Sequence, residues 1–85
     1  MQYIVLQRKE NEETNTFGPF NELEDARQWM LEDFSRALLV AEREFGKIEG
    51  AVIRNRSNET DLPEAHLDME NLTNQTWQIL MLFQP

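Results

Sequence analysis

The chain has 85 residues, which is enough for one domain but too few for two separate hydrophobic cores. It contains no cysteine, and this excludes a disulfide framework, a thiolate nucleophile and any thiolate-bound metal. Sixteen acidic residues oppose eight basic ones, which gives a formal net charge of −8. Because a phosphate backbone rewards clustered Lys and Arg, this balance disfavours direct binding to nucleic acid or to an anionic membrane. It favours a partner with a basic surface, or serves solubility alone.

Neither a membrane span nor a signal sequence is indicated. No stretch approaches the roughly 20 consecutive apolar residues that cross a bilayer. The apolar run at residues 3–6 is too short for a signal sequence, and it precedes the positive charges instead of following them. Since small secreted domains usually depend on disulfides, we expect a cytoplasmic protein.

The N-terminal residues predict a β-hairpin. Residues 3–6 are β-branched, aromatic or aliphatic, so residues 2–9 are expected to form a strand that is buried on both faces. An acidic turn follows at residues 10–13, and the alternation at residues 14–17 predicts a short second strand. We expect Gly18-Pro19 to end this strand, because Pro cannot donate a hydrogen bond to a ladder.

A long helix is predicted from Asn21 to Phe45. Asn21 is a good N-cap, and Glu24 three residues later completes a capping-box pattern. The apolar residues recur at steps of three and four and so lie on one face: Leu23, Ala26, Met30, Phe34, Ala37, Ala41 and Phe45. Gly46 can adopt the left-handed backbone angle that commonly ends a helix.

Three further elements are predicted in the second half of the chain. Residues 47–56 are expected to form a strand, in which Gly50 indicates a bulge or a close backbone approach. Apolar residues at helical spacing, preceded by the capping-box pair Asp61 and Glu64, predict a short helix over residues 62–71. Residues 76–84 predict a last strand that is apolar on both faces and therefore central in its sheet.

Together these elements predict one α+β domain over residues 1–85. It consists of a three- to four-stranded, mostly antiparallel sheet, with the long helix packed on one face and a short second helix. The first and last strands are expected to be central. A sheet that is apolar on both faces must be covered twice, and the short helix or a second copy of the chain, forming a homodimer, would provide the second cover.

The sequence shows no strong signature of chemistry. Glu64, His66 and Asp68 alternate, so they would diverge on a helix and share a face only on a strand; either way they are a weak metal signal. The acidic turn lacks the ligand spacing of a calcium loop, and the three glycines form no phosphate cradle. We therefore expect no metal, no cofactor and no catalytic residue. A small ligand-binding domain or enzyme built from scattered residues is the alternative.

The long helix carries more apolar residues than one sheet requires. Trp29 and Val40 flank the apolar face, and Leu39 points nearly opposite to it. Trp is enriched at interface hot spots, although sheet curvature or the short helix could instead cover Trp29. The helix acids outnumber its arginines, which fits either an acidic docking face or an ordinary solvated helix with pairs such as Glu32–Arg36. The predicted partner-binding residues are Trp29, Glu32, Asp33, Leu39, Val40, Glu42 and Glu44.

A short first strand, the segment Phe17-Gly18-Pro19-Phe20, an acidic helix start with Ala26 and Trp29, and a last strand led by Trp77 occur together. In this combination the chain resembles small orphan proteins of phages and mobile elements. The resemblance implies a small α+β domain, sometimes an inhibitor that binds a host defence protein, and no catalytic or binding residue carries over from it. The polar stretch at residues 56–75 departs from the shortest members and leaves the pairing of the last strand open.

The leading functional prediction is a non-enzymatic protein-binding module. We expect it to act as an inhibitor that occludes the surface of a host defence or nucleic-acid-binding protein. A self-associating structural or assembly protein is the second hypothesis.

Overall fold

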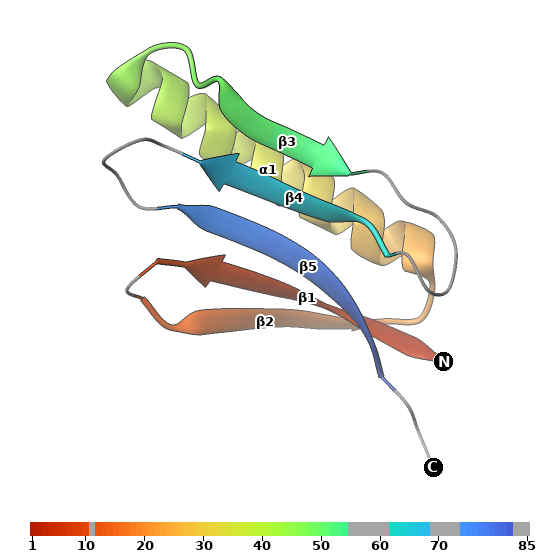
Figure 1. Ribbon diagram of the computed structural model, residues 1–85. Coiled ribbons are helices and arrows are strands. Elements are labelled where there is room, and N and C mark those ends of the chain that lie inside the picture. Colours follow the sequence, from red (N-terminus) through yellow and green to blue (C-terminus); the bar gives the residue numbers. More distant parts are fainter. Residues whose placement is uncertain (11, 55–61, 69–73, 83–85) are drawn as a thin grey trace.

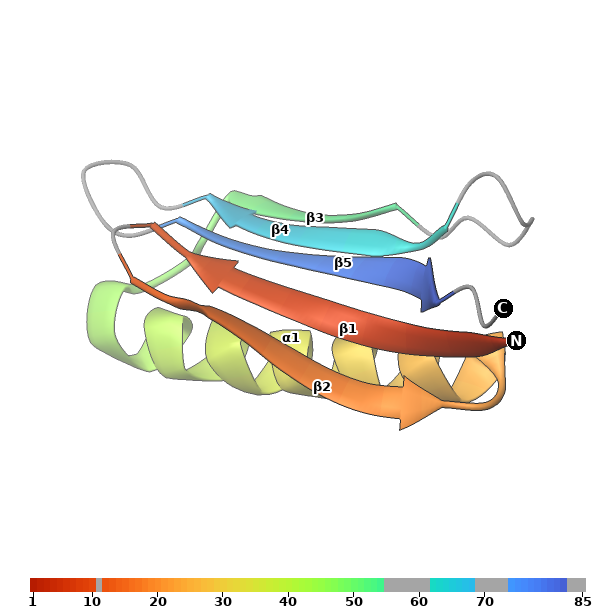
Figure 2. The same cartoon turned by 90° about the horizontal axis from the view of Figure 1, so that it is seen from below.

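The computed structural model describes residues 1–10, 12–54, 62–68 and 74–82. Within them lie five strands and one helix, in the order β1 (Gln2–Lys9), β2 (Thr14–Phe20), α1 (Leu23–Phe45), β3 (Gly50–Arg54), β4 (Glu64–Asp68) and β5 (Gln75–Leu82). The strands form a single sheet, and α1 lies across one face of it (Figure 1). Seen from below, no helix of the described residues covers the other face (Figure 2).

All neighbouring strands are antiparallel, and their spatial order is β2-β1-β5-β4-β3. The helix therefore connects the strand at one edge of the sheet to the strand at the other edge. The prediction that the first and last strands lie inside the sheet is confirmed, since β1 and β5 pair along their whole length, from Gln2 opposite Leu82 to Lys9 opposite Gln75. The expected three to four strands are too few.

The core lies between α1 and the sheet face that it covers. Its fully or nearly fully buried members are Val5, Ala26, Met30, Phe34, Ala41, Ala65, Leu67, Trp77 and Ile79. Small alanines on the helix let it approach the sheet, and the large side chains fill the space between the two layers. The rings of Phe34 and Trp77 meet edge to face, with their centroids 5.3 Å apart. Burying an apolar side chain of this size stabilises the fold by about 1.5–3 kcal/mol.

The predicted helix over residues 62–71 is wrong where the structure describes it. Residues 64–68 form strand β4, which pairs with both β3 and β5, while residues 69–71 lie outside the described residues. Ala65 and Leu67 are buried beneath α1, whereas His66 between them points away from the helix. This period of two is the strand pattern. The helix prediction rested instead on the spacing of Leu62, Ala65, His66, Met69 and Leu72, the last two of which lie outside the described residues.

Several boundaries also differ from the prediction, and β3 begins at Gly50 instead of residue 47. Strand β2 continues through Gly18-Pro19 to Phe20, with a cis peptide between the two and a register shift opposite β1. An edge strand tolerates Pro because the missing N–H faces away from the ladder. The helix begins at Leu23 with Glu22 as its N-cap residue, and the Asn21 side chain instead accepts a hydrogen bond from Gln2 Nε2 (3.2 Å).

The two glycine predictions are confirmed. Gly46 has φ +83° and closes α1 by donating its N–H to the carbonyl of Glu42 (2.9 Å). Gly50 lies so close to Asp68 on β4 that a side chain there would meet its backbone carbonyl oxygen. Gly50 therefore allows β3 to pair closely with β4.

Candidate partner-binding surface

Trp29 belongs to an aromatic cluster that joins α1 to β2. It is half-buried, and its ring centroid lies 4.3 Å from that of Phe17 and 6.4 Å from that of Phe20. Both phenylalanines extend from β2 and flank the Gly18-Pro19 segment. Strand β2 therefore covers part of the Trp29 ring, where the sequence suggested sheet curvature or a short helix as the cover.

Asp33 faces the sheet. Its Oδ2 accepts hydrogen bonds from the Trp77 indole Nε1 (3.0 Å) and from Gln7 Nε2 (3.1 Å). The Trp77 side chain is completely buried, so its N–H needs an acceptor within the protein. Asp33 therefore anchors the helix to β5 and β1 through one oxygen. The side chain has this structural role in addition to placing a negative charge at the edge of the helix.

The apolar side chains that remain exposed on α1 lie in its C-terminal half. Leu39, Val40 and Phe45 are 50%, 52% and 53% exposed. The sequence pattern indicated the first two as exposed but placed Phe45 on the buried face. Phe45 is the last residue of the helix. The spacing of apolar residues does not reveal that Ala41 is the last helix residue to reach the core.

A groove runs between this half of α1 and the end of β1. Its walls include Val40, Glu44 and Phe45 from the helix and Gln7 and Lys9 from β1, with Asp33, Arg36, Ala37, Ala41 and Gln75 completing the lining. Three of the predicted residues, Asp33, Val40 and Glu44, therefore share one concave surface. The groove combines apolar walls with two acids and two bases, and its lining from Lys9, Phe45 and Gln75 was not foreseen.

Gln75 lines this groove and carries a buried acceptor. Its side-chain Oε1 accepts no hydrogen bond from the described residues. A buried acceptor without a donor is unfavourable for folding. Nothing in the sequence distinguishes this glutamine from the others.

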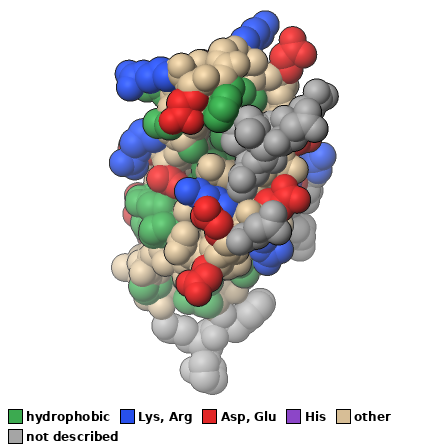
Figure 3. Space-filling model, turned by 90° about the vertical axis from the view of Figure 1, so that its left-hand side faces the viewer, with side chains coloured by type: hydrophobic (Ala, Val, Ile, Leu, Met, Phe, Trp, Pro, Cys, Tyr) green, Lys and Arg blue, Asp and Glu red, His purple; other side chains and the backbone are tan. Residues whose placement is uncertain are grey.

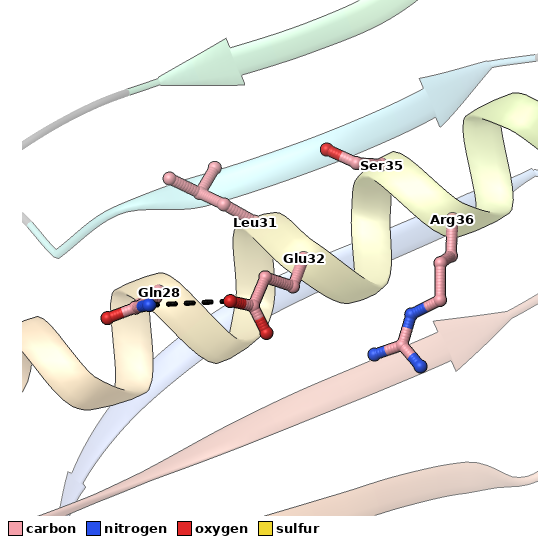
Figure 4. A pocket seen from close by; sticks show the side chains of 5 residues that line it. All are labelled: Gln28, Leu31, Glu32, Ser35 and Arg36. Atoms are coloured by element: carbon pink, nitrogen blue, oxygen red, sulfur yellow. Dashed lines mark hydrogen bonds between the residues drawn. The ribbon is translucent and has the colours of Figure 1, made fainter.

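Glu32 lies on the outer side of the helix. It accepts a hydrogen bond from Gln28 (3.3 Å), one turn earlier, and the two line a shallow depression together with Leu31, Ser35 and Arg36 (Figure 4). In this view Leu31 projects towards the β4 side of α1 and Arg36 towards the β1 side, so the depression is a flat area and not an enclosed site. Glu42 is exposed further along the same helix.

Charges of both signs are interspersed on this part of the molecule. Figure 3 views the end at which α1 stops, and it shows acidic and basic side chains beside one another, with hydrophobic side chains between them. Within α1 six acidic residues accompany Arg27, Arg36 and Arg43, and Arg27 pairs with Glu24 at 2.7 Å. The helix surface is therefore acidic on balance but not uniformly so.

The His66 trio does lie on one face, because β4 is a strand. His66 Nε2 is 3.7 Å from Glu64 Oε2, and Glu64 also pairs with Arg54 at 3.3 Å. No group of three His, Cys, Asp or Glu side chains within the described ranges is arranged to hold a metal ion. In the same ranges, no helix has both the length and the apolar character that crossing a bilayer requires.

No protein-family model, curated protein or solved structure matches this chain.

Proposed function

We propose that this protein is a non-enzymatic protein-binding module whose docking surface is the C-terminal half of α1 and the groove beside it. The observation that carries the proposal is the group of half-exposed apolar side chains Leu39, Val40 and Phe45. A core needs none of them, and large apolar side chains exposed on a rigid helix are typical of interaction sites. Val40 and Phe45 line the groove, whereas Leu39 lies on the outer side of the helix. The groove next to Val40 and Phe45 would accept an apolar side chain of the partner.

The charges around this surface favour a basic partner. The whole chain carries a formal charge of −8, and Glu42 and Glu44 are exposed beside the apolar group. Such a field speeds the encounter with a positively charged surface. Arg36 and Arg43 interrupt the acidic pattern, and mixed signs at a rim fix the orientation of a partner more than they add affinity.

The proposed mode of action is occlusion. A rigid helix that covers a basic surface blocks it for other ligands, and nucleic-acid-binding proteins carry such surfaces. We therefore propose that the partner is a host protein, from defence or from nucleic-acid binding, and that the module inhibits it. This role needs shape and charge, which the described residues supply, and it needs no catalytic residue.

The test compares two leucines on opposite sides of the molecule. Leu39 is 50% exposed on α1, and Leu80 is 42% exposed on the sheet face that lacks a helix. We expect a tagged chain to retain a partner from its source cell, Leu39→Arg to lose that partner, and Leu80→Arg to keep it. A charge at a hot spot costs at least about 2 kcal/mol, or about thirtyfold in affinity.

Charge reversal separates the electrostatic part of the proposal. The double change Glu42→Lys with Glu44→Lys should weaken binding, and the loss should shrink as salt is raised. Asp33 is left unchanged in this variant because it holds the Trp77 N–H. A partner that binds Leu39→Arg and the double variant as well as it binds the unchanged chain would rule out this surface.

A further inference from the structure

The two edges of the sheet differ in how well they are protected. An edge strand exposes backbone N–H and C=O groups that can pair with another strand. β2 forms one edge and β3 the other. Natural sheets blunt such edges with Pro, bulges or charges, so the presence or absence of these devices shows which edge can be extended.

The β2 edge is blunted. Pro19 supplies no N–H, and two residues, Gly18 and Pro19, stand opposite the single Ile4 of β1 where the register shifts. Gly18 has φ +119°, an angle that ordinary strand residues avoid. A bulge that twists the edge and lacks a donor is a poor template for a further strand.

The β3 edge has neither a Pro nor a bulge, and its single charge is Arg54 at its C-terminal end. Its sequence is Gly-Ala-Val-Ile-Arg, it contains no Pro, and it pairs with β4 in regular register over its whole length. Val52 and Ile53 point to opposite faces of the sheet, and each is 46% exposed. A regular, apolar, exposed edge strand is the arrangement that recruits another strand.

We propose that β3 pairs antiparallel with β3 of a second copy of this chain, so that two sheets join edge to edge in a two-fold dimer. The register sets Val52 opposite the same residue of the other copy and Ile53 opposite Ala51. Apolar residues then meet apolar residues on both faces of the joined sheet, and main-chain hydrogen bonds form along its seam. This inference is separate from the proposed function, because it uses neither Leu39 nor the groove.

The charges on the strand allow this register. Arg54 of one copy stands opposite Gly50 of the other, so no like charges face each other. Gly50 has no side chain that could block the approach of this Arg54, and its own Cα lies against Asp68 of β4. Arg54 pairs with Glu64 of its own chain at 3.3 Å, so its charge is already balanced when the two copies meet.

The occupant is a second copy, and not an open series of copies, because each chain offers only one suitable edge among its described residues. Pairing through the same strand of both copies uses up that edge, and the blunted β2 edges remain at the two ends. An interface of this isologous kind closes at two chains. The joined sheet contains five strands from each copy, with both helices on the same face.

The experiment uses single-cysteine variants of the full chain, which has no cysteine of its own. In the proposed register the two Cβ atoms at position 52 lie about 4.5–5.5 Å apart, close to disulfide range, and those at position 53 about 7–8 Å. Under mild oxidation Val52→Cys should form a covalent dimer, whereas the equally exposed Ile53→Cys should not. Thr16→Cys on the β2 edge should also remain monomeric on a non-reducing gel.

Sedimentation equilibrium of the unchanged chain completes the test. We expect a dimer that dissociates on dilution, and we expect Val52→Lys, which sets two lysines opposite each other, to sediment as a folded monomer with an unchanged far-UV spectrum. Thr16→Lys should remain dimeric. A chain that is monomeric throughout the dilution series would overturn the proposal, and so would crosslinking through position 16 or 53 in preference to position 52.

Discussion

Asp33 combines two tasks in one side chain. The sequence places it at the edge of the apolar face of the helix, where a carboxylate can turn either to solvent or to the sheet. The structure turns it to the sheet, where it meets Gln7 and Trp77. No local pattern predicts this, because the indole that needs an acceptor is 44 residues away in the chain. Exposed positions such as Leu39 follow from helix geometry alone and were predictable.

Replacing Asp33 tests its structural task. Asp33→Ala leaves the buried Trp77 N–H without an acceptor, and we expect it to lower the free energy of unfolding by about 1–3 kcal/mol. Asp33→Asn keeps an oxygen that can accept the bond and should lose less. The control is Glu32→Ala at the exposed position next to it. Its free energy of unfolding should stay within about 0.5 kcal/mol of that of the unchanged chain in urea titrations. Equal losses for the variants at positions 32 and 33 would contradict this role.

Among the elements, α1 and β1 were predicted closely and β4 was not. Seven apolar positions at steps of three and four leave no doubt about a helix, and its end at Gly46 has a clear chemical cause. The helical spacing of apolar residues over 62–72 outweighed the short alternation within residues 64–68, so β4 was assigned to the wrong type. The extension of β2 through Pro19 depended on its place at the sheet edge, which the sequence does not reveal.

The glycines at positions 46 and 50 allow a prediction about two element boundaries. Gly46→Ala has open space around the added methyl group, but φ +83° with ψ −161° is a backbone conformation essentially confined to glycine, so it should cost about 1–3 kcal/mol of unfolding free energy. Gly50→Ala drives a methyl group against the backbone of β4 and should cost about 3 kcal/mol. Thermal or urea unfolding at one fixed protein concentration ranks the two. The reverse ranking would mean that β3 and β4 do not approach each other as closely as described.

At the scale of the whole molecule, the sheet separates two surfaces with different tasks. The helix side presents Leu39, Val40 and Phe45, and the β3 edge presents Val52 and Ile53. In the proposed dimer both helices lie on one side of a continuous sheet, so two docking surfaces would face the same way. Two linked sites raise the apparent affinity for a partner that is itself dimeric or repeated, provided that the spacing matches. The sequence indicated spare apolar residues, but only the strand order shows which of them share a surface.

The sheet face without a helix also exposes an apolar side chain. Leu80 is exposed there and stands opposite Ile4 in the register of β1 and β5. The predicted second cover by a short helix is absent within the described residues, since β4 occupies that place in the chain. The edge-to-edge dimer leaves this face open as well, which is why Leu80 serves as the control position for the helix surface.

Hydrogen exchange of the full chain, with and without the partner that it retains, locates the docking surface. We expect added protection in the C-terminal half of α1 and at the Lys9 end of β1, with β2 and the amides around Leu80 unchanged. Protection confined to β2 or to the sheet face that carries Leu80, with residues 36–46 exchanging as in the free protein, would contradict it.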